Sequence, residues 1–354
     1  MVNKKILITG NEAIGKGAID AGCFFYAGYP ITPQNELTSY MAESMPKAKR
    51  IFIQAESEIS AINMVFGASA AGMRAMTSSS SPGISLKQEG ISYLAGAELP
   101  AVIVNVMRGG PGLGNIAAAQ SDYFQATRAG GHGDYHCIVL APFSIQESYD
   151  FMKLAFDLAD KYRNPVLILS DGMLGQMMEP LFLGRSRHTP YAIHHTPKWA
   201  ISGCLRRKPN VIRSLYLKEG VLEKLNLKLQ EKYKKIKEKE ARYEILYLED
   251  AKIILVAYGT MARIVKSVVK KLRQKGKKIG LIRPITLWPF PEKIFQYLSL
   301  KHKGLKFLVV EMSYGQMLED VKLALNGKAK VEFLGRAGGG IPTEEEIIKR
   351  VIAL

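Results

Sequence analysis

Four short polar segments follow apolar runs in the first half of the chain. They are residues 28–34, 54–58, 78–83 and 108–115. They contain two glutamates, Glu56 and Glu58, a row of serines, and Arg108. Because open α/β sheets bind ligands at the carboxyl ends of their strands, we expect these segments to meet at one sheet edge. A carboxylate, hydroxyls and a guanidinium that can grip an anion with two hydrogen bonds would suit a small polar ligand.

Each of these groups also has an ordinary structural interpretation. Glu56 and Glu58 would suit the first turn of any helix, where the helix dipole favours carboxylates. Serines that precede Pro82 and Gly83 are common helix caps. The predicted convergence of all four segments at one edge is what favours a functional site.

Two glycine-rich segments resemble nucleotide-binding loops but lack their chemistry. Residues 10–17 nearly match a P-loop, yet Gly17 stands where a Ser or Thr must hold Mg²⁺, and Glu12 would repel phosphate. This pattern favours a tight turn from strand to helix. The glycines of residues 109–115 do not have dinucleotide-binding spacing, and Pro111 interrupts them.

The elements that would position these groups alternate along the chain. Branched apolar runs typical of buried parallel strands are residues 6–9, 24–27, 51–54, 102–106, 138–140 and 166–169. Helices are expected near 35–45, 57–72, 84–97, 116–129 and 145–162. This alternation predicts a doubly wound, mostly parallel α/β domain.

A second, smaller α/β domain is expected at the carboxyl end. Its strands are predicted at residues 253–256, 279–282, 307–310 and 331–334, and its helices near 261–275, 316–326 and 343–353. Between the domains, residues 185–244 contain 16 of the 49 Lys+Arg and six of the 32 Asp+Glu, more than half of the net charge of +17. An apolar stripe from Leu222 to Ile236 predicts a helix that packs on a domain or a partner. No nucleic-acid module is visible, so we do not expect nucleic-acid binding.

Composition limits the remaining possibilities. The 354 residues suffice for two domains, and 47% are apolar. No apolar run reaches the ~20 residues of a membrane span, and the first residues are too short a run for a signal peptide. Cys23, Cys137 and Cys204 are too dispersed for a disulfide framework, a zinc site, or an iron–sulfur cluster held by this chain alone. We therefore expect a cytoplasmic protein without membrane attachment.

Together these segments resemble the alpha-type subunit of thiamine-diphosphate-dependent 2-oxoacid:ferredoxin oxidoreductases. The matching motifs are Tyr29-Pro30-Ile31-Thr32-Pro33, Glu56-Ser57-Glu58-Ile59-Ser60-Ala61, Thr77-Ser78-Ser79-Ser80-Ser81-Pro82-Gly83, Val106-Met107-Arg108-Gly109 and Gly335-Arg336-Ala337-Gly338-Gly339-Gly340. The resemblance covers nearly the whole chain. It implies a pyrimidine-binding domain at 1–184, a basic connector at 185–249 and a transketolase C-terminal-like domain at 250–354. The strings at 54–58, 85–90 and 131–135 look most like subunits of 2-oxoisovalerate enzymes, with 2-oxoglutarate enzymes next.

The resemblance also implies roles for individual residues. Thiamine diphosphate needs a carboxylate against its pyrimidine ring, and this role falls to Glu58, with Glu56 as the second candidate. Arg108 would bind the carboxylate of the 2-oxoacid, and Thr32 would hydrogen-bond its carboxylate or keto oxygen. The other residues implied to contact the cofactor are Tyr29, Pro30, Ile31, Ser80 and Ser81.

By the same resemblance, this chain is one subunit of a larger enzyme. The family's Mg²⁺-diphosphate motif has no match, because Asp134 and Asp171 both lack the expected neighbours. A beta-type subunit would hold Mg²⁺ and the diphosphate, while gamma-type and small ferredoxin-like subunits would complete the complex, with iron–sulfur clusters on partner chains. Coenzyme A would be the co-substrate and ferredoxin the electron acceptor. His188, His194 and His195 are interpreted as connector histidines, so no metal site is expected in this chain. The alternative is a non-catalytic binding or regulatory relative of the same fold.

Overall fold

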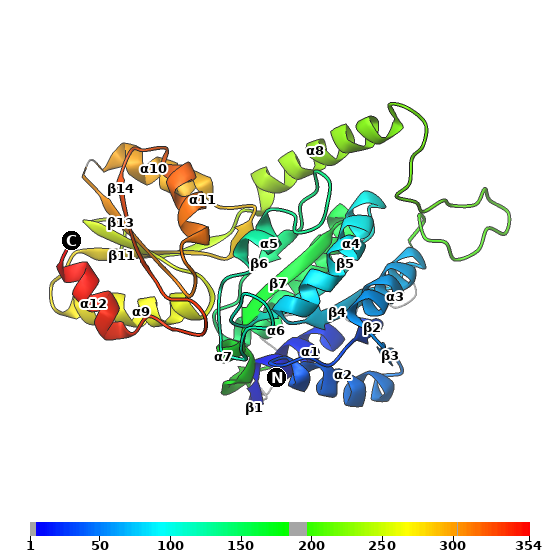
Figure 1. The fold of residues 1–354 in the computed structure, drawn as a ribbon, viewed down its shortest axis with the longest axis horizontal. Helices are drawn as coiled ribbons and strands as arrows, with labels where there is room; N and C mark the ends of the chain where they lie inside the picture. Colours follow the sequence, from blue (N-terminus) through cyan, green and yellow to red (C-terminus); the bar gives the residue numbers. More distant parts are fainter. Residues whose placement is uncertain (1–4, 184–196, 303) are drawn as a thin grey trace.

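The computed structural model describes residues 5–183, 197–302 and 304–354 (Figure 1). Its largest sheet has seven strands in the order β12-β6-β7-β5-β4-β2-β3. All neighbours pair in parallel except β12, which pairs antiparallel with β6. The strands are β2 (Phe25–Gly28), β3 (Ile51–Gln54), β4 (Ala75–Ser79), β5 (Ala101–Met107), β6 (Ile138–Leu140), β7 (Pro165–Asp171) and β12 (Thr286–Trp288).

Helices cover both faces of this sheet. On one face α1 (Gly10–Asp20) packs beside α2 (Asn35–Lys47) and α6 (Ile145–Tyr162). On the other, α3 (Glu58–Ala70) packs against α4 (Ser81–Gly96). The connections from β3 to β4 through α3 and from β4 to β5 through α4 cross the sheet in one direction. The connections through α2 and α6 cross it in the other direction. Because such connections are right-handed, the two pairs of helices must lie on opposite faces of the sheet. The predicted doubly wound fold is confirmed.

Two local predictions in this half were wrong. The run at residues 6–9 forms β1 (Lys5–Thr9), but β1 pairs antiparallel with β8 (Met178–Phe182) in a separate two-stranded sheet, and Leu7 is 66% exposed. The helix expected near 116–129 is reduced to α5 (Tyr123–Thr127). The residues before α5 instead form hydrogen bonds to loops that follow strands of the second sheet. The Gln120 amide donates to the Met312 carbonyl (2.9 Å), and the Gln120 side chain donates to the Tyr258 carbonyl (2.9 Å).

The glycine-rich start of α1 is a turn from strand to helix, as predicted. The Glu12 amide donates to the Thr9 hydroxyl (3.2 Å), and the Glu12 carboxylate accepts from the Thr9 amide (3.0 Å). This reciprocal cap uses the backbone donors that a phosphate would need.

The second sheet has five strands in the order β14-β13-β10-β11-β9. They are β9 (Tyr243–Leu246), β10 (Ile253–Val256), β11 (Ile279–Pro284), β13 (Lys306–Glu311) and β14 (Lys330–Gly335). The helices around it pack in pairs, α9 (Gly259–Gln274) with α12 (Glu344–Ile352) and α10 (Glu292–Lys301) with α11 (Gln316–Leu325). Three strands were not expected: β8, which pairs with β1, β9, at the end of the predicted connector, and β12, which joins the larger sheet.

The charged helix between the sheets is α8 (Val221–Glu240), which stands out from the body in Figure 1. Leu229, Tyr233 and Ile236 of its apolar stripe are buried, whereas Leu222 at the stripe's start is 49% exposed. Connector histidines 188, 194 and 195 lie outside the described residues. No helix of the described chain combines the length and apolar character needed to cross a membrane.

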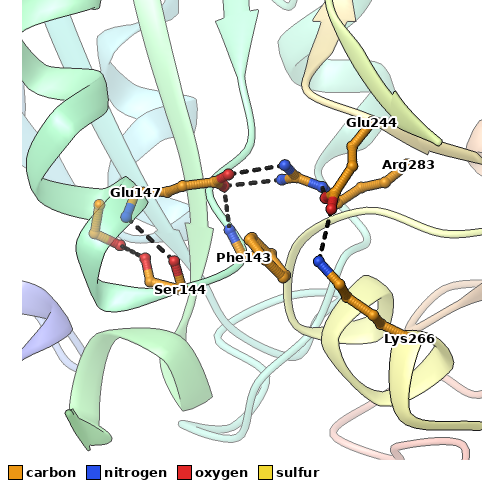
Figure 2. A network of polar contacts seen from close by, with 7 residues as sticks. Phe143, Ser144, Glu147, Glu244, Lys266 and Arg283 are labelled. Carbon is orange, nitrogen blue, oxygen red and sulfur yellow. Dashed lines mark hydrogen bonds and ion pairs between the residues drawn. The ribbon is translucent and has the colours of Figure 1, made fainter. Parts of the chain in front are cut away.

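An ionic network around the buried Arg283 joins the two larger sheets and the helices beside them (Figure 2). Arg283 of β11 donates two hydrogen bonds to Glu147 of α6, both 2.8 Å, and a third to Glu244 of β9 (2.8 Å). Lys266 of α9 also reaches Glu244 (2.6 Å), and the Arg283 guanidinium lies 4.2 Å from the centroid of the Phe143 ring. The two parts of the chain are therefore tied through a fully paired arginine.

Candidate active site

The predicted residues surround the carboxyl ends of β2 and β4, which are neighbours in the sheet. The chain leaves these two strands in opposite directions, because β2 leads to β3 on one side and β4 leads to β5 on the other. Crevices of this kind are where doubly wound folds bind ligands. A hydroxyl network closes the crevice floor: the Tyr26 hydroxyl lies 2.6 Å from that of Ser78, which donates to Gln34 Oε1 (2.7 Å).

The two candidate glutamates have different environments. Glu58 is the first residue of α3 and is buried, with 6% of its surface exposed. Ser57 caps the helix by accepting a hydrogen bond from the Ser60 amide (3.2 Å). Glu56 is exposed, and its carboxylate accepts a hydrogen bond from the Ser60 hydroxyl. Only Glu58 therefore faces the interior of the crevice.

The Glu58 carboxylate is bordered by a glycine that must stay small. A Cβ added at Gly83 would lie 2.6 Å from Glu58 Oε1 and 2.1 Å from Ser79 Oγ. The buried hydroxyls of Ser79 and Ser80 have no hydrogen-bond partner among the described residues. No described residue donates a hydrogen bond to the neighbouring Glu58 carboxylate. Buried polar groups without partners are uncommon and indicate a place where a ligand completes the bonding.

Lys87 is a site residue that was not predicted. It lies on α4 with no exposed surface, and its ammonium donates to the Glu58 carbonyl (3.3 Å) and the Thr77 hydroxyl (3.1 Å). Burial lowers the pKa of Lys87 to about 8, while the charge of Glu58 opposes the decrease. The signal was available, because Ile84, Lys87 and Ile91 share one face of α4 at spacings of three and four.

Arg108 and Thr32 lie together on the other side of the crevice. One Arg108 nitrogen, Nη1, donates to the Thr32 carbonyl (2.9 Å) and to its hydroxyl (3.4 Å), and Nη2 donates to the Leu113 carbonyl (2.9 Å). The guanidinium is buried, and its Nε has no partner among the described residues. The arginine is thus held in place while its Nε donor is left over.

A polar cluster holds the start of the Arg108 loop. Ser81 Oγ accepts from the Arg108 amide (3.0 Å) and donates to Asp122 (2.6 Å), which also accepts from Asn105 (2.8 Å). Burial raises the pKa of Asp122, and the hydrogen bonds from Ser81 and Asn105 oppose that increase. Ser81 therefore connects the start of α4 to the end of β5 at Arg108. This role could not be predicted from the position of Ser81 before a Pro-Gly pair.

The remaining predicted residues differ in exposure. Tyr29 and Pro30 are exposed, Ile31 is half-buried and Ser80 is buried. The carboxyl-terminal glycine motif lies beside the loop that follows Arg108, because Asn115 Nδ2 donates to the Gly338 carbonyl (2.9 Å). A cavity of about 600 Å³ elsewhere, between α8 and the loop after β12, is lined by none of the predicted site residues.

Other acidic candidates have structural partners. Asp171 is buried as the cap of α7 (Gly172–Gln176), where it accepts from two backbone amides and from the Thr260 hydroxyl (2.9 Å). Asp134 is exposed on a loop. Within the described residues no cluster of His, Cys, Asp and Glu could hold a metal ion.

Comparison with known proteins gives a consistent assignment. Residues 16–199 match the family described as pyruvate flavodoxin/ferredoxin oxidoreductase, thiamine diphosphate-binding, and residues 251–347 match pyruvate:ferredoxin oxidoreductase core domain II. The ketoisovalerate oxidoreductase subunit VorB of Methanothermobacter marburgensis is 52% identical over 98% of this chain and 96% of its own. The 2-oxoglutarate synthase subunit KorA of the same organism is 37% identical over the full length of both.

Solved structures agree with this result. The 2-oxoglutarate:ferredoxin oxidoreductase of Magnetococcus marinus, determined with 2-oxoglutarate, coenzyme A and succinyl-CoA, superposes with a TM-score of 0.86 at 28% identity. The match covers 99% of this chain but 65% of that one. A split-gene transketolase, 15% identical with a TM-score of 0.62, shares the fold. The chain therefore belongs to the thiamine-diphosphate-dependent 2-oxoacid:ferredoxin oxidoreductase family, as a subunit that contains the thiamine-diphosphate-binding domain and core domain II.

Proposed function

We propose that this chain supplies the pyrimidine-binding half of a thiamine diphosphate site in an enzyme that oxidatively decarboxylates 2-oxoisovalerate to an acyl-CoA. The observation that supports the site is the buried Glu58 carboxylate, which lies against Gly83 without a hydrogen-bond donor. The preference for 2-oxoisovalerate over 2-oxoglutarate follows from 52% identity to a ketoisovalerate subunit against 37% to a 2-oxoglutarate subunit.

The residues at the crevice fit the cofactor's pyrimidine half. When bound, thiamine diphosphate supplies the carbanion chemistry that decarboxylation of a 2-oxoacid requires. Glu58 would share a proton with a ring nitrogen, a task for a carboxylate that is shielded from water. The absence of a side chain at Gly83 leaves room for the Glu58 carboxylate and the Ser79 hydroxyl, and the unpartnered hydroxyls of Ser79 and Ser80 offer further hydrogen bonds. Tyr29, Pro30, Ile31 and Ser81 would complete the pocket, while Glu56 is too exposed for this role.

Arg108 and Thr32 would bind the substrate. The free Nε of Arg108 can donate to a carboxylate, and Nη2, which shares that edge of the guanidinium and bonds the Leu113 carbonyl, would provide the second bond of a paired grip. The Thr32 hydroxyl, on the exposed side of the same loop, would then donate to a substrate oxygen. Because the carboxylate is held in both the ground state and the transition state, the main effect of this grip is on substrate binding.

Apolar side chains on the segments around Glu58 and Arg108 support a partner subunit at this edge. They are Tyr29 (38% exposed), Ile59 (50%), Leu86 (51%), Leu113 (80%) and Ile116 (64%). Exposed apolar groups clustered around a polar site are typical of an interface. A beta-type subunit that carries Mg²⁺ and the diphosphate would cover it. Gamma-type and small ferredoxin-like subunits with iron–sulfur clusters would pass electrons to ferredoxin, and coenzyme A would accept the acyl group.

The domain limits 1–184, 185–249 and 250–354 and a cytoplasmic location belong to the same proposal. Buried Cys23 and Cys137, whose pKa values burial raises to about 12, are inert thiols compatible with a reducing compartment.

The test is co-expression with candidate partner subunits, followed by a screen of 2-oxoacids with coenzyme A and a one-electron dye. We expect oxidation of 2-oxoisovalerate with a higher kcat/KM than 2-oxoglutarate. A complex that binds thiamine diphosphate but oxidises no 2-oxoacid would favour the alternative of a binding or regulatory relative. A higher kcat/KM for 2-oxoglutarate would overturn the substrate assignment alone.

A further inference from the structure

Lys87 is a buried charge without a paired acid. Its side chain has no exposed surface, and it forms no ion pair with any described residue. An ammonium has three donors, and two of them are used here, by the Glu58 carbonyl at 3.3 Å and the Thr77 hydroxyl at 3.1 Å. Burying a charge in this way costs free energy unless another charge compensates for it.

Packing alone gives no reason for a lysine here. The neighbouring positions on the same face of α4, Ile84 and Ile91, are apolar and buried, and a methionine would fill a similar volume without a charge. The low pKa of Lys87, about 8, reflects this burial. Since the fold gains no obvious stability from the charge, its use should be sought in what it contacts.

The contact is with the first residue of α3, which is Glu58 itself. We propose that Lys87 is a positioning residue for Glu58: its hydrogen bond to the Glu58 carbonyl fixes the start of α3, and its positive charge stabilises the negative charge that develops on the carboxylate as it shares a proton with the cofactor. This inference rests on the proposed function, and it adds an electrostatic partner to the acid–base group. The opposite charges need no direct contact, because both residues are buried and charges interact more strongly where water is excluded.

The other charged groups nearby are directed elsewhere. From α3, Glu58 is the charge that acts on Lys87. On its own helix, Glu89 is exposed and accepts a hydrogen bond from Tyr93. On the side of β5, Asp122 is held by Ser81 and Asn105. Thr77, the contact on β4, does not titrate.

The experiment measures exchange of the cofactor's thiazolium C2 proton with solvent deuterium in the assembled enzyme, from pH 6 to 9.5, without substrate. Lys87→Met should slow this exchange about tenfold at pH 7, the scale expected of one nearby charge. The ratio of wild-type to Lys87→Met rates should fall toward one as the pH rises through 8, because the native lysine then loses its charge. Lys87→Gln keeps a donor without the charge and should follow the methionine variant.

A matched control is available in Lys232 of α8. This lysine is also largely buried, with a pKa lowered to about 8 by burial, but it pairs with Glu98 away from the crevice. Lys232→Met should lower the thermal unfolding temperature and leave the exchange ratio constant with pH. The proposal would be overturned if the Lys87 variants lose stability while the ratio of the wild-type exchange rate to theirs stays constant from pH 6 to 9.5.

The control also separates this proposal from the proposed function. If the wild-type complex does not accelerate C2-proton exchange over the rate of free cofactor, the proposed function fails. If it does, and Glu58→Gln removes this acceleration while Lys87→Met and Lys87→Gln match wild type at every pH, the role of Lys87 alone is wrong. Should Lys87→Met not assemble, Lys87→Gln and the wild-type rate profile above pH 8 decide the question.

Discussion

Two buried ionic regions of this chain differ in how completely they are paired. At the contact between the sheets, Arg283 uses three hydrogen bonds on two glutamates, and Lys266 completes the network (Figure 2). At the crevice, Glu58, Lys87 and Arg108 are equally buried, yet they form no ion pair among themselves or with other described residues. A satisfied network stabilises a fold, whereas unpaired buried charges indicate groups kept ready for a ligand.

The largest expected effect lies in the paired region. Arg283→Met would leave the half-buried carboxylates of Glu147 and Glu244 without their main buried partner, and should lower the free energy of unfolding by about 3–5 kcal/mol. Urea or thermal denaturation of the complex would measure this. Lys47→Met, which breaks an exposed pair with Glu43, is the control and should change stability by less than about 0.5 kcal/mol. If both variants were equally stable, the sheets would not be held by this network.

The next effect concerns Glu58. Glu58→Gln preserves the shape of the side chain but cannot take up a proton, so kcat of the assembled enzyme should fall by ~10²-fold or more. Substrate KM should change little. Steady-state kinetics with a one-electron dye measures both values. A fall in kcat of less than threefold would show that the acid–base group lies elsewhere.

Arg108→Lys should have a smaller and different effect. Lysine keeps the charge but loses the planar fork, so KM for the 2-oxoacid should rise by about tenfold, the scale of one charged hydrogen bond. The kcat value should stay within about threefold. Comparing the two constants across several 2-oxoacids checks this, and a lower kcat with unchanged KM would place Arg108 in the chemical step instead.

The smallest effect is expected at the other glutamate. Glu56 is exposed and bonds only the Ser60 hydroxyl at the start of α3, so Glu56→Gln should change kcat by less than about twofold. Comparing this variant with Glu58→Gln tests whether only one of the two glutamates, which are two residues apart, contributes to kcat. Equal losses in both variants would contradict the assignment.

Local sequence patterns located the edge of the sheet but not its internal bonding. The strand ends before Glu58 and Arg108 were visible because continuous apolar runs stop there. Lys87 was overlooked because a lysine in a helix is usually exposed, and only its spacing from Ile84 and Ile91 pointed inward. The bonds of Ser81 to Asp122 and Asn105 span 41 and 24 residues, and no local rule predicts such pairings.

The errors in the predicted elements have the same origin. Residues 116–129 have a helical pattern, but long-range hydrogen bonds from Gln120 to Tyr258 and Met312 hold most of the segment as a loop. Likewise β12 follows Arg283 in sequence yet pairs with β6, because the contact between the sheets brings the two together. Tertiary contacts overrode local propensity at both places.

The most direct test of the account is C2-proton exchange of thiamine diphosphate in three samples: the isolated chain, the assembled complex, and the complex with Glu58→Gln. A half-site with Glu58 as its acid–base group predicts rapid exchange in the wild-type complex only. The isolated chain should leave exchange at the rate of free cofactor, and the Glu58→Gln complex should be at least about 10²-fold slower than wild type. Rapid exchange in the isolated chain, or equal rates in the two complexes, would contradict the account.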